Sequence, residues 1–516
     1  MDSSPAPAGL QAVLIVGAGP TGLLLALWLT KLGIPVRIID KSSGPGETSR
    51  AVIVHARTLE YYRQLRISGD ALAHGSTIKG IGIHRRGRLV GGLNFRNAGA
   101  GLSYFPFAFT FPQDQHEKVL VAQLAGMGVY VERRTTLTAL EEDDGGIFAT
   151  SQDADGLETT FHASCLVGCD GSKSTVRELS GIAMPGGTYD QRFFVADADV
   201  RGKAAEFSMN PCFTGTDFCL VLPLPAMGST RLIGVVPDGV DREDVRFEHV
   251  EAAVKYNTEL EIDHVRWFAT YRVHHRVAER FRRGRVFIAG DAGHLHSPAG
   301  GQGMNTGLGD VSNLAWKLAA VLTKRANPAL LDTYEPERMA FAHLLVDTTD
   351  WVWSGVTNRG WWGWFVRIIL LPRILSFALW FSVSRRAAFS RVSQIMIEYR
   401  ASELSQGGKK SAKIQPGDRL PWVEFDDGTD NHAMLDLLDW QVHVYGGMSP
   451  DLRKAVDALG IVCHEYPWTR EVAAKGFVRH ALYLVRPDGH VGFVDTNASP
   501  EALEEYLDRW EIELRR

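Results

Sequence analysis

AVLIVGAGPTGLLLALWLTKLGIPVRIID, residues 12–40, joins two short apolar runs through a glycine-rich turn and an apolar segment of helical length. Short continuous apolar runs are typical of parallel strands that are buried on both faces. The segment between them has apolar positions that suit a helix, and Gly33 can end that helix. The stretch therefore predicts a βαβ unit, the opening of a parallel α/β sheet.

The turn carries Gly17, Gly19 and Gly22 in G-x-G-x-x-G register, and Asp40 follows 18 positions after the last glycine. In this register the first glycine permits the tight turn, the second lets backbone N–H groups approach a pyrophosphate, and the third allows close helix–strand contact. The helix N-terminus favours the phosphate charge. Asp40 would bond a free ribose hydroxyl and repel a 2′-phosphate. The turn therefore predicts a dinucleotide site, and these residues leave both FAD and NAD open.

Two further motifs follow apolar, strand-like runs. CDGSKSTVR occupies residues 169–177, and GDAGHLHSPAGGQGMNTGLGDVSNLAWKL occupies residues 290–318. Together with GAGPTG at residues 17–22, their order and separations resemble the class A flavoprotein monooxygenases over about residues 10–345. These are single-component aromatic hydroxylases with the fold of para-hydroxybenzoate hydroxylase. The sequence has no second G-x-G-x-x-G after a strand, which fits enzymes whose NAD(P)H docks transiently in a surface groove.

The resemblance implies an α/β fold built around FAD. Residues 1–183 plus 275–345 would form a Rossmann-like FAD-binding domain of the glutathione-reductase type. Residues 184–274 would form an inserted antiparallel sheet that binds the substrate, and residues 346–405 a helical segment.

Residues 406–516 resemble the thioredoxin-like C-terminal domain of phenol and polyketide hydroxylases, with VRPDGHVGF at residues 485–493 as its closing hairpin. Cys463 is the only cysteine of this segment and no C-x-x-C is present, so thiol–disulfide exchange is not expected. The odd total of five cysteines predicts free thiols. No metal site is expected, because the CLVGC run at residues 165–169 has no Cys/His cluster beside it.

The resemblance also implies which residues bind FAD. The glycines of the first motif would hold the pyrophosphate, and Asp40 the adenosine ribose. Gln113 would meet the ribityl or phosphate region, with Gln115 as the alternative register. The full set implied for the cofactor is Gly17, Gly19, Pro20, Thr21, Gly22, Asp40, Lys41, Arg50, Gln113, Asp170, Asp291, Pro298, Gly301, Gly303, Met304 and Asn305.

The second and third motifs would complete the cofactor site. Asp170 is implied to organise both FAD and the pyridine nucleotide, with Arg177 in the same turn. Asp291 is implied to bind the ribityl chain, and a carboxylate at the carboxyl edge of a sheet suits that task. Arg50, in the loop after the second strand, would lie near the cofactor as a contact for the reductant.

The glycines of the third motif have an expected role at the flavin ring. Pro298 would stiffen the turn. The glycines at 300, 301 and 303 remove side chains, so that backbone N–H groups can reach the edge of a planar ring. The helix that begins near Met304 and Asn305 would place its positive N-terminal end against the negative charge of a reduced flavin.

By the resemblance, NAD(P)H reduces FAD, and reduced FAD adds O2 to give a C4a-hydroperoxide that hydroxylates an electron-rich aromatic carbon. The candidate catalytic residues are Arg50, Pro298, Tyr104 and Tyr271, the two tyrosines as donors that orient a phenol. His294 and His296 are weaker candidates for a base, since this stretch mostly shapes the loop in the family. Side chains that could line the pocket are Tyr189, Phe194, Phe213 and Trp267.

Two other functions stay open from the sequence. One is a related FAD enzyme, such as an epoxidase, oxidase or reductase, that acts on a non-aromatic substrate. The other is a flavin-binding protein without catalysis. Oxygen incorporation from O2 distinguishes them from a hydroxylase.

Charge and hydropathy restrict partners and location. A net charge of -5 gives no reason to expect nucleic acid. The N-terminus lacks a secretory signal pattern, so a cytoplasmic location is expected. The tryptophan-rich stretch at residues 346–385 invites a membrane reading, but Arg367, Pro372 and Arg373 leave 11 uncharged residues, 374–384, against the roughly 20 that a span needs. We expect a small-molecule aromatic substrate, no membrane contact, and helices that cover the FAD domain or form a homodimer contact.

Overall fold

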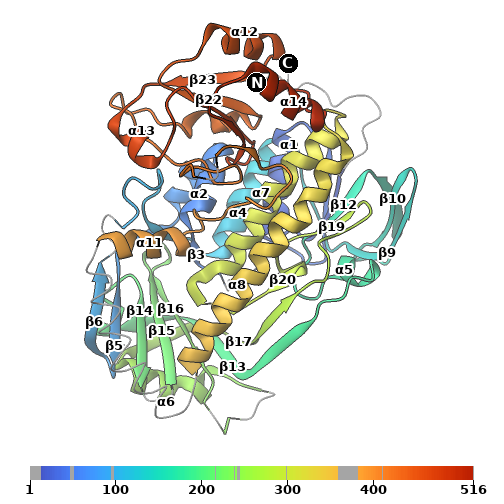
Figure 1. The fold of residues 1–516 in the computed structure, drawn as a ribbon. Helices are drawn as coiled ribbons and strands as arrows, with labels where there is room; N and C mark the ends of the chain where they lie inside the picture. The colour runs from blue at the N-terminus through green and yellow to red at the C-terminus, as the bar shows by residue number, and fades with distance from the viewer. Residues whose placement is uncertain are drawn as a thin grey trace.

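The computed structural model describes residues 13–46, 51–94, 98–214, 217–237, 239–240, 244–297, 299–357, 382–409 and 411–514. Over these residues the chain is a mixed α/β protein, as predicted, with one six-stranded, one eight-stranded, one five-stranded and two three-stranded sheets. The helices α7 and α8 run through the middle of the molecule, between the eight-stranded sheet and the C-terminal domain (Figure 1).

The predicted βαβ unit is present. β1 (Val13–Val16) pairs in parallel with β2 (Val36–Asp40), and α1 (Pro20–Lys31) connects them. β1 also pairs in parallel with β12 (Cys165–Gly168), which pairs in parallel with β19 (Val286–Ile288). Because all three strands run the same way, the motifs that follow them gather at one edge of the sheet. The sheet order is β18 (Arg282–Arg283), β19, β12, β1, β2 and β8 (Val131–Arg133).

Helices cover this sheet, and α1 is buried among them. α1 contacts both α4 (Gln113–Gly126) and α7 (Gln302–Leu322), and residues 23–29 of α1 are all buried. α8 (Tyr334–Thr357) packs along α7. A helix that is apolar all round is stable only when it is covered on several sides, and this explains the apolar sequence of α1. The shorter helices are α2 (Ala56–Gln64), α3 (Ser68–Ala73) and α5 (Thr175–Leu179).

The eight-stranded sheet is antiparallel except for a parallel contact between β14 and β5. α6 (Phe247–Thr258) packs on one face, where Phe247, Val250 and Val254 join Phe194 in one apolar cluster. The sheet order is β20 (His294–Leu295), β17 (Glu261–Val277), β13 (Gly186–Arg201), β16 (Ser229–Val235), β15 (Asp217–Leu224), β14 (Asn210–Thr214), β5 (Gly80–Arg85) and β6 (Arg88–Asn94).

The predicted segment, residues 184–274, does not include all the strands of this sheet. β5 and β6 come from residues 80–94, far earlier in the chain, and β17 continues to Val277. The 80–94 hairpin is rich in glycine and arginine, so it lacks the apolar run that marks a strand locally. Its position depends instead on pairing with β14, which lies more than a hundred residues later.

Two small sheets complete this part of the molecule. One is an antiparallel meander of β9 (Thr136–Asp143), β10 (Gly146–Gln152) and β11 (Glu158–Ala163). The other pairs β7 (Ala108–Thr110) with β3 (Ile53–Val54) and β4 (Ser76–Ile78).

The C-terminal part has the mixed topology expected of a thioredoxin-like domain. β22 (Gln441–Tyr445) pairs in parallel with β23 (Val462–Tyr466) through α12 (Pro450–Leu459). The predicted closing hairpin is present as β24 (Leu482–Val485) and β25 (Val491–Asp495). The remaining elements are β21 (Gln406–Gly407), α13 (Arg470–Lys475) and α14 (Pro500–Arg509). All five cysteines of the chain are free.

The tryptophan-rich stretch is described only in part. α8 extends to Thr357 and α11 spans Ser382–Val392, while residues 358–381 lie outside the described structure. Within the described ranges, none of the helices has both the length and the apolar character to cross a membrane.

A buried group of charges joins the C-terminal domain to the helices α7 and α8. Glu337 of α8 accepts hydrogen bonds from Arg486 at 2.9 and 3.0 Å and from Lys317 of α7 at 2.7 Å. All three side chains are at most 1% exposed. Burial alone would raise the pKa of Glu337, but Arg486 and Lys317 outweigh it and hold the pKa at about 2. The domain contact therefore depends on a carboxylate that stays ionised.

We predict that Glu337→Gln destabilises the protein by about 3–5 kcal/mol, because it leaves buried cations without their anion. Urea unfolding followed by circular dichroism measures this change. Glu465→Gln is the matched control, since its pair with Arg453 is exposed and its loss should leave the midpoint unchanged. Equal effects of the two variants would contradict the prediction.

Candidate functional site

The three sequence motifs meet at the first turn of α1. Gly17 has φ 103°, and a Cβ on it would lie 2.3 Å from the Cys169 carbonyl oxygen. A Cβ on Gly290 would lie 2.8 Å from Thr21 Oγ1, and one on Gly307 would lie 2.6 Å from the same atom. The glycine turn, the 169–177 motif and the 290–318 motif are thus in direct contact, as the dinucleotide hypothesis requires.

The three glycines of the first motif have different surroundings. A Cβ on Gly22 would lie 2.0 Å from the Gly17 carbonyl oxygen, so Gly22 is needed for the close packing of α1. A Cβ on Gly19 would meet no atom within 4 Å. Gly19 is also the N-cap of α1, where backbone N–H groups are unpaired. Open space in front of a helix N-terminus fits a pyrophosphate.

Asp40 lies at the edge of the same turn. Its Oδ2 accepts a hydrogen bond from the Ala18 N–H at 2.5 Å, and its Oδ1 accepts one from the Ser42 N–H at 2.7 Å. Arg133 approaches Oδ1 at 3.8 Å. Oδ1 also accepts from the Ser42 hydroxyl. These contacts hold the carboxylate beside the glycine turn, and Oδ2 keeps a lone pair that a ribose hydroxyl can use. The neighbouring Lys41 is exposed.

In the second motif, Asp170 and Arg177 have structural partners. Asp170 accepts hydrogen bonds from Ser174 Oγ at 2.5 Å and from the Val176 N–H at 3.1 Å, and burial raises its pKa. Arg177 donates to the carbonyl oxygens of Ser172 and Ala292 at 3.1 and 3.0 Å. Arg177 therefore ties the second motif to the third.

The third motif presents Asp291 on an exposed turn and then a glycine-rich bend. The turn is the short 3₁₀ segment Gly290–Ala292. Gly301 has φ 65°, and a Cβ on it would lie 2.6 Å from Ile53 Cβ, so β3 packs directly on the bend. Gly303 is less crowded, since a Cβ there would lie 3.5 Å from His296 Nε2. Pro298, like Arg50, lies outside the described residues.

Asn305 organises the bend through its side chain. Its Oδ1 accepts from the His55 N–H and from Thr58 Oγ1, both at 2.8 Å. Its Nδ2 donates to the carbonyl oxygens of Ile53 and Gly301 at 2.9 and 2.8 Å. These four bonds satisfy the amide completely, so its side chain positions the bend and has no donor left for a ligand. The neighbouring Met304 is half-buried and packs against the core.

Gln113 lies at the start of α4 beside the loop that leads to Arg50. Its backbone N–H donates to the Ala51 carbonyl oxygen at 3.0 Å, and its Nε2 donates to Glu117 at 2.9 Å. Glu117 in turn accepts from the Gly46 N–H at 2.8 Å. The alternative residue, Gln115, donates to the adjacent Asp114 instead. The geometry favours Gln113 as the residue that faces this loop.

The two candidate phenols lie in different surroundings. Tyr271 of β17 pairs with Phe193 of β13, with ring centroids 5.9 Å apart, on the sheet face opposite α6. Tyr104 is 52% exposed and stacks under Arg63 of α2 at 4.0 Å. The structure therefore does not bring the two tyrosines together.

The four aromatic side chains expected in the pocket also separate. Phe194 belongs to the cluster under α6, so it points away from the face that carries Tyr271. Tyr189 stands edge-on to His275, and Phe213 packs against Phe218. Trp267 shares the Tyr271 face, because it pairs with Asp197, which lies four residues after Phe193 on β13 and therefore on the same face of the sheet.

Asp197 and Arg231 form a buried ion pair on this face that the sequence analysis did not single out. Arg231 is fully buried and makes two hydrogen bonds to Asp197, at 2.7 and 2.6 Å. The available signal was an acidic residue at an alternating position of the apolar run RFFVADADV and an arginine in TRLIGVV. Their mutual register could not be read from either run alone.

Histidines surround the bend but are not free bases. His55 Nε2 donates to the Gly300 carbonyl oxygen at 3.1 Å, and burial lowers its pKa to about 4. Burial also lowers the pKa of His296 to about 4. His294 contacts the buried carboxylate of Asp310 at 2.7 Å. All three rings thus have roles within the fold.

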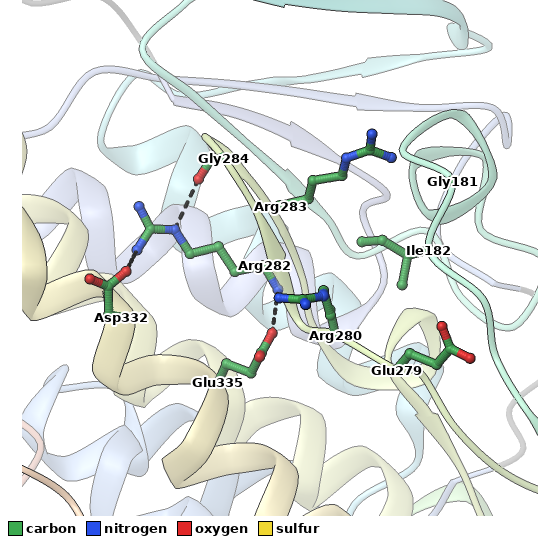
Figure 2. Close-up of a pocket in the computed structure, with 9 residues that line it drawn as sticks. All are labelled: Gly181, Ile182, Glu279, Arg280, Arg282, Arg283, Gly284, Asp332 and Glu335. Carbon is green, nitrogen blue, oxygen red and sulfur yellow. Dashed lines mark hydrogen bonds and ion pairs between the residues drawn. The ribbon is translucent and has the colours of Figure 1, made fainter.

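A cavity of about 670 Å³ lies elsewhere. Figure 2 shows it between the β18 hairpin and the start of α8, with Arg280 and Arg283 on its wall. Arg282 is held there by Asp332 and by the Gly284 carbonyl oxygen. None of the described candidate site residues lines this cavity, and we assign it no part in the chemistry.

The fold and the site define a dinucleotide-binding α/β protein with an added antiparallel sheet. Residues 11–349 match a family model described as an FAD binding domain, and residues 413–511 match one described as the C-terminal part of aromatic-ring hydroxylases. The chain belongs to the FAD-dependent aromatic-ring hydroxylases. FAD is its cofactor, and NAD(P)H and O2 are the co-substrates of the family.

Individual relatives agree with this assignment. The chain is 35% identical to 6-methylpretetramide 4-monooxygenase of Streptomyces rimosus, over 82% of this chain and 76% of the relative. It is 33% identical to pentachlorophenol 4-monooxygenase of Sphingobium chlorophenolicum, over 82% and 77%. The solved structure of an anhydrotetracycline hydroxylase from Streptomyces rimosus superposes with a TM-score of 0.77 at 27% identity, covering 98% of this chain and 100% of that one.

We predict that two glycine variants differ in their effect on stability. Gly19→Ala should fold with an unchanged unfolding midpoint, because its Cβ meets nothing, yet bind FAD at least about tenfold more weakly, because the methyl group blocks phosphate access. Gly22→Ala should lower stability as well, since its Cβ collides with the Gly17 carbonyl. FAD titration of apoprotein and thermal unfolding measure both. Normal FAD affinity in Gly19→Ala would contradict the cradle assignment.

We also predict that stability falls on acidification between pH 6.5 and about 4. His55 has a pKa of about 4 in the folded protein and about 6.5 when unfolded, so below pH 6.5 the unfolded chain binds the proton first. The contribution of neutral His55 to the free energy of unfolding is complete above pH 6.5. By pH 5 roughly 2 kcal/mol of this contribution is lost. Urea unfolding at pH 7.5 and 5 measures the change, and His55→Gln should show a smaller one. An identical pH dependence in that variant would refute the assignment.

Proposed function

We propose that this protein is a FAD-dependent monooxygenase that uses NAD(P)H and O2 to hydroxylate a phenolic or aromatic polyketide-like substrate. The observation that carries the proposal is the contact of the three motifs at the first turn of α1, where Gly17 approaches Cys169 and Thr21 approaches Gly290 and Gly307. Relatives named for 6-methylpretetramide and for pentachlorophenol support an aromatic substrate and span both polycyclic and single-ring sizes.

The chain's own groups would bind the cofactor in two places. The open N-terminus of α1 at Gly19 holds the pyrophosphate, and Asp40 accepts from the adenosine ribose. Asp291, on its exposed turn, accepts from the ribityl hydroxyls. Gln113 and Asp170 complete the contacts, with Lys41 at the exposed edge. Bound FAD then supplies electron transfer from NAD(P)H and the activation of O2.

The N-terminus of α7 would stabilise the charge of the reduced ring. α7 begins at Gln302, directly after Gly301, and its first N–H groups have no partner within the helix. Their partial positive charge favours an anion in front of them. Gly300 and Gly301 both have positive φ, and the tight bend that this permits would let backbone N–H groups approach the ring.

The eight-stranded sheet would hold the substrate against this ring. Val52, which immediately precedes β3, packs on Leu222 and Leu224 of β15, so the sheet lies next to the strand that contacts Gly301. The face that carries Tyr271 is the one opposite α6. Tyr271 can donate a hydrogen bond that orients a phenol, and the aromatic side chains Phe193 and Tyr271 can exclude water from it.

The remaining candidate residues have supporting roles in this proposal. We keep Arg50 as a contact for the reductant and Pro298 as the stiffener of the bend. Tyr104, exposed on Arg63, is a weaker candidate than Tyr271. A homodimer and a cytoplasmic location are also part of the proposal, and light scattering of the purified protein and cell fractionation test them.

The proposal predicts that phenols stimulate NAD(P)H oxidation by the purified holoprotein and that the product gains one oxygen atom from O2. Stopped-flow absorbance and mass spectrometry under oxygen-18 gas measure the two effects. An unlabelled product indicates an oxidase or reductase, and absence of any stimulated oxidation over a panel of single-ring and polycyclic phenols indicates a binding protein. Either result would remove the monooxygenase assignment.

The same assay tests Tyr271. Tyr271→Phe removes one hydrogen bond to the phenol and should lower kcat for hydroxylation about tenfold or more, while leaving FAD affinity unchanged. Tyr130→Phe is the matched control, because Tyr130 is 71% exposed on the surface. A kcat equal to the control's would exclude Tyr271 as the orienting group.

A further inference from the structure

The buried carboxylate of Asp310 holds the turn that presents Asp291. Asp310 of α7 accepts a hydrogen bond from the Gly290 N–H at 3.0 Å and one from His294 Nε2 at 2.7 Å, both through Oδ2. Gly290 and His294 bracket Asp291 in sequence. The carboxylate therefore fixes both ends of the segment that carries the ribityl-binding candidate.

Arg338 of α8 holds Asp310 in place. Its Nε donates to Asp310 Oδ1 at 2.7 Å, and Asp310 and Arg338 are both fully buried. Its Nη2 donates to the Thr306 carbonyl oxygen at 3.1 Å, in the first turns of α7. A Cβ on Gly309 would lie 3.0 Å from the same nitrogen, so the guanidinium rests against the backbone of α7.

The charge state of this pair is fixed. Burial alone would raise the pKa of Asp310, but His294 and Arg338 outweigh it and hold the pKa at about 2. The carboxylate is thus ionised at neutral pH. A buried ion pair of this kind adds little net stability over apolar packing, so its main contribution is a fixed geometry.

The same arginine reaches the C-terminal domain. Arg338 Nη1 donates to the Tyr399 hydroxyl at 2.9 Å. The Tyr399 ring lies 4.4 Å from the His490 ring and 5.1 Å from the Arg486 guanidinium, both in the β24–β25 hairpin. The preceding residue on α8, Glu337, pairs with Arg486 directly. Two adjacent residues of one helix therefore link the hairpin to the flavin-binding turn.

We propose that Asp310 is a positioning residue: through Gly290 and His294 it sets the turn that presents Asp291 to the ribityl chain, and Arg338 and Tyr399 connect this turn to the C-terminal domain. The inference rests on the proposed role of Asp291. It gives the C-terminal domain a task in cofactor binding that needs no thiol chemistry.

A double-mutant cycle tests the inference with the full-length apoprotein. Asp310→Asn, Asp291→Asn and the double variant are titrated with FAD, and the quenching of flavin fluorescence gives Kd. We expect about a tenfold higher Kd for each single variant. Because Asp310 acts through Asp291, Asp310→Asn should change Kd less than twofold in the Asp291→Asn background.

Asp430→Asn is the matched control. Asp430 is a buried carboxylate that pairs with Arg63 of α2 at 2.7 Å, and this pair takes no part in the link through Arg338 and Tyr399. It should lower the melting temperature as Asp310→Asn does and leave Kd for FAD within twofold of the unaltered protein. Tyr399→Phe, a milder change, should raise Kd about two- to threefold and serves if Asp310→Asn does not fold.

The outcomes separate the inference from the proposed function. If Asp291→Asn leaves Kd unchanged, the ribityl assignment is wrong and the inference falls with it. If Asp291→Asn raises Kd but Asp310→Asn acts equally in both backgrounds, Asp310 affects stability only and the inference alone is overturned. Equal increases in Kd for Asp310→Asn and Asp430→Asn would overturn it as well.

Discussion

The structure depends on how closely the backbone segments approach one another at the first turn of α1. Contacts at Gly17, Gly22, Gly290 and Gly307 would each place a Cβ within 2.8 Å of another atom. Real Cβ atoms do not come so close, so no side chain is accommodated at any of these positions. The parallel sheet brings three strand ends together, and the missing side chains let the loops after them touch. Gly19 faces open space, which leaves one side of the cluster for a ligand.

Buried charges then fix what the glycines bring together. Asp310 with Arg338 holds the Gly290 turn, and Glu337 with Arg486 holds the C-terminal domain against α8. A carboxylate or guanidinium removed from water has few acceptable positions, because each hydrogen bond must be satisfied. Such pairs specify geometry more than they add stability. This fits a protein in which several long elements must meet at one cofactor.

The local elements could be predicted from the sequence, whereas their long-range partners could not. The βαβ unit, the glycine registers and the PDG hairpin each depend on residues within a short window, so a pattern is sufficient. The side chain of Asn305 bonds to His55, 250 residues away, and β5 pairs with β14 across the fold. Neither contact has a local signature. The same holds for Asp197 with Arg231, where each strand shows a charge but not its partner.

The five thiols of this chain have surroundings that matter for an oxygenase. Reduced flavins exposed to O2 without substrate release hydrogen peroxide, and peroxide attacks thiolates far faster than thiols. Burial raises the pKa of Cys165 to about 11 and those of Cys212 and Cys463 to about 12, and it raises those of Cys169 and Cys219 as well. All five sulfurs stay protonated at neutral pH. The thiols are therefore in the form that reacts slowly with peroxide.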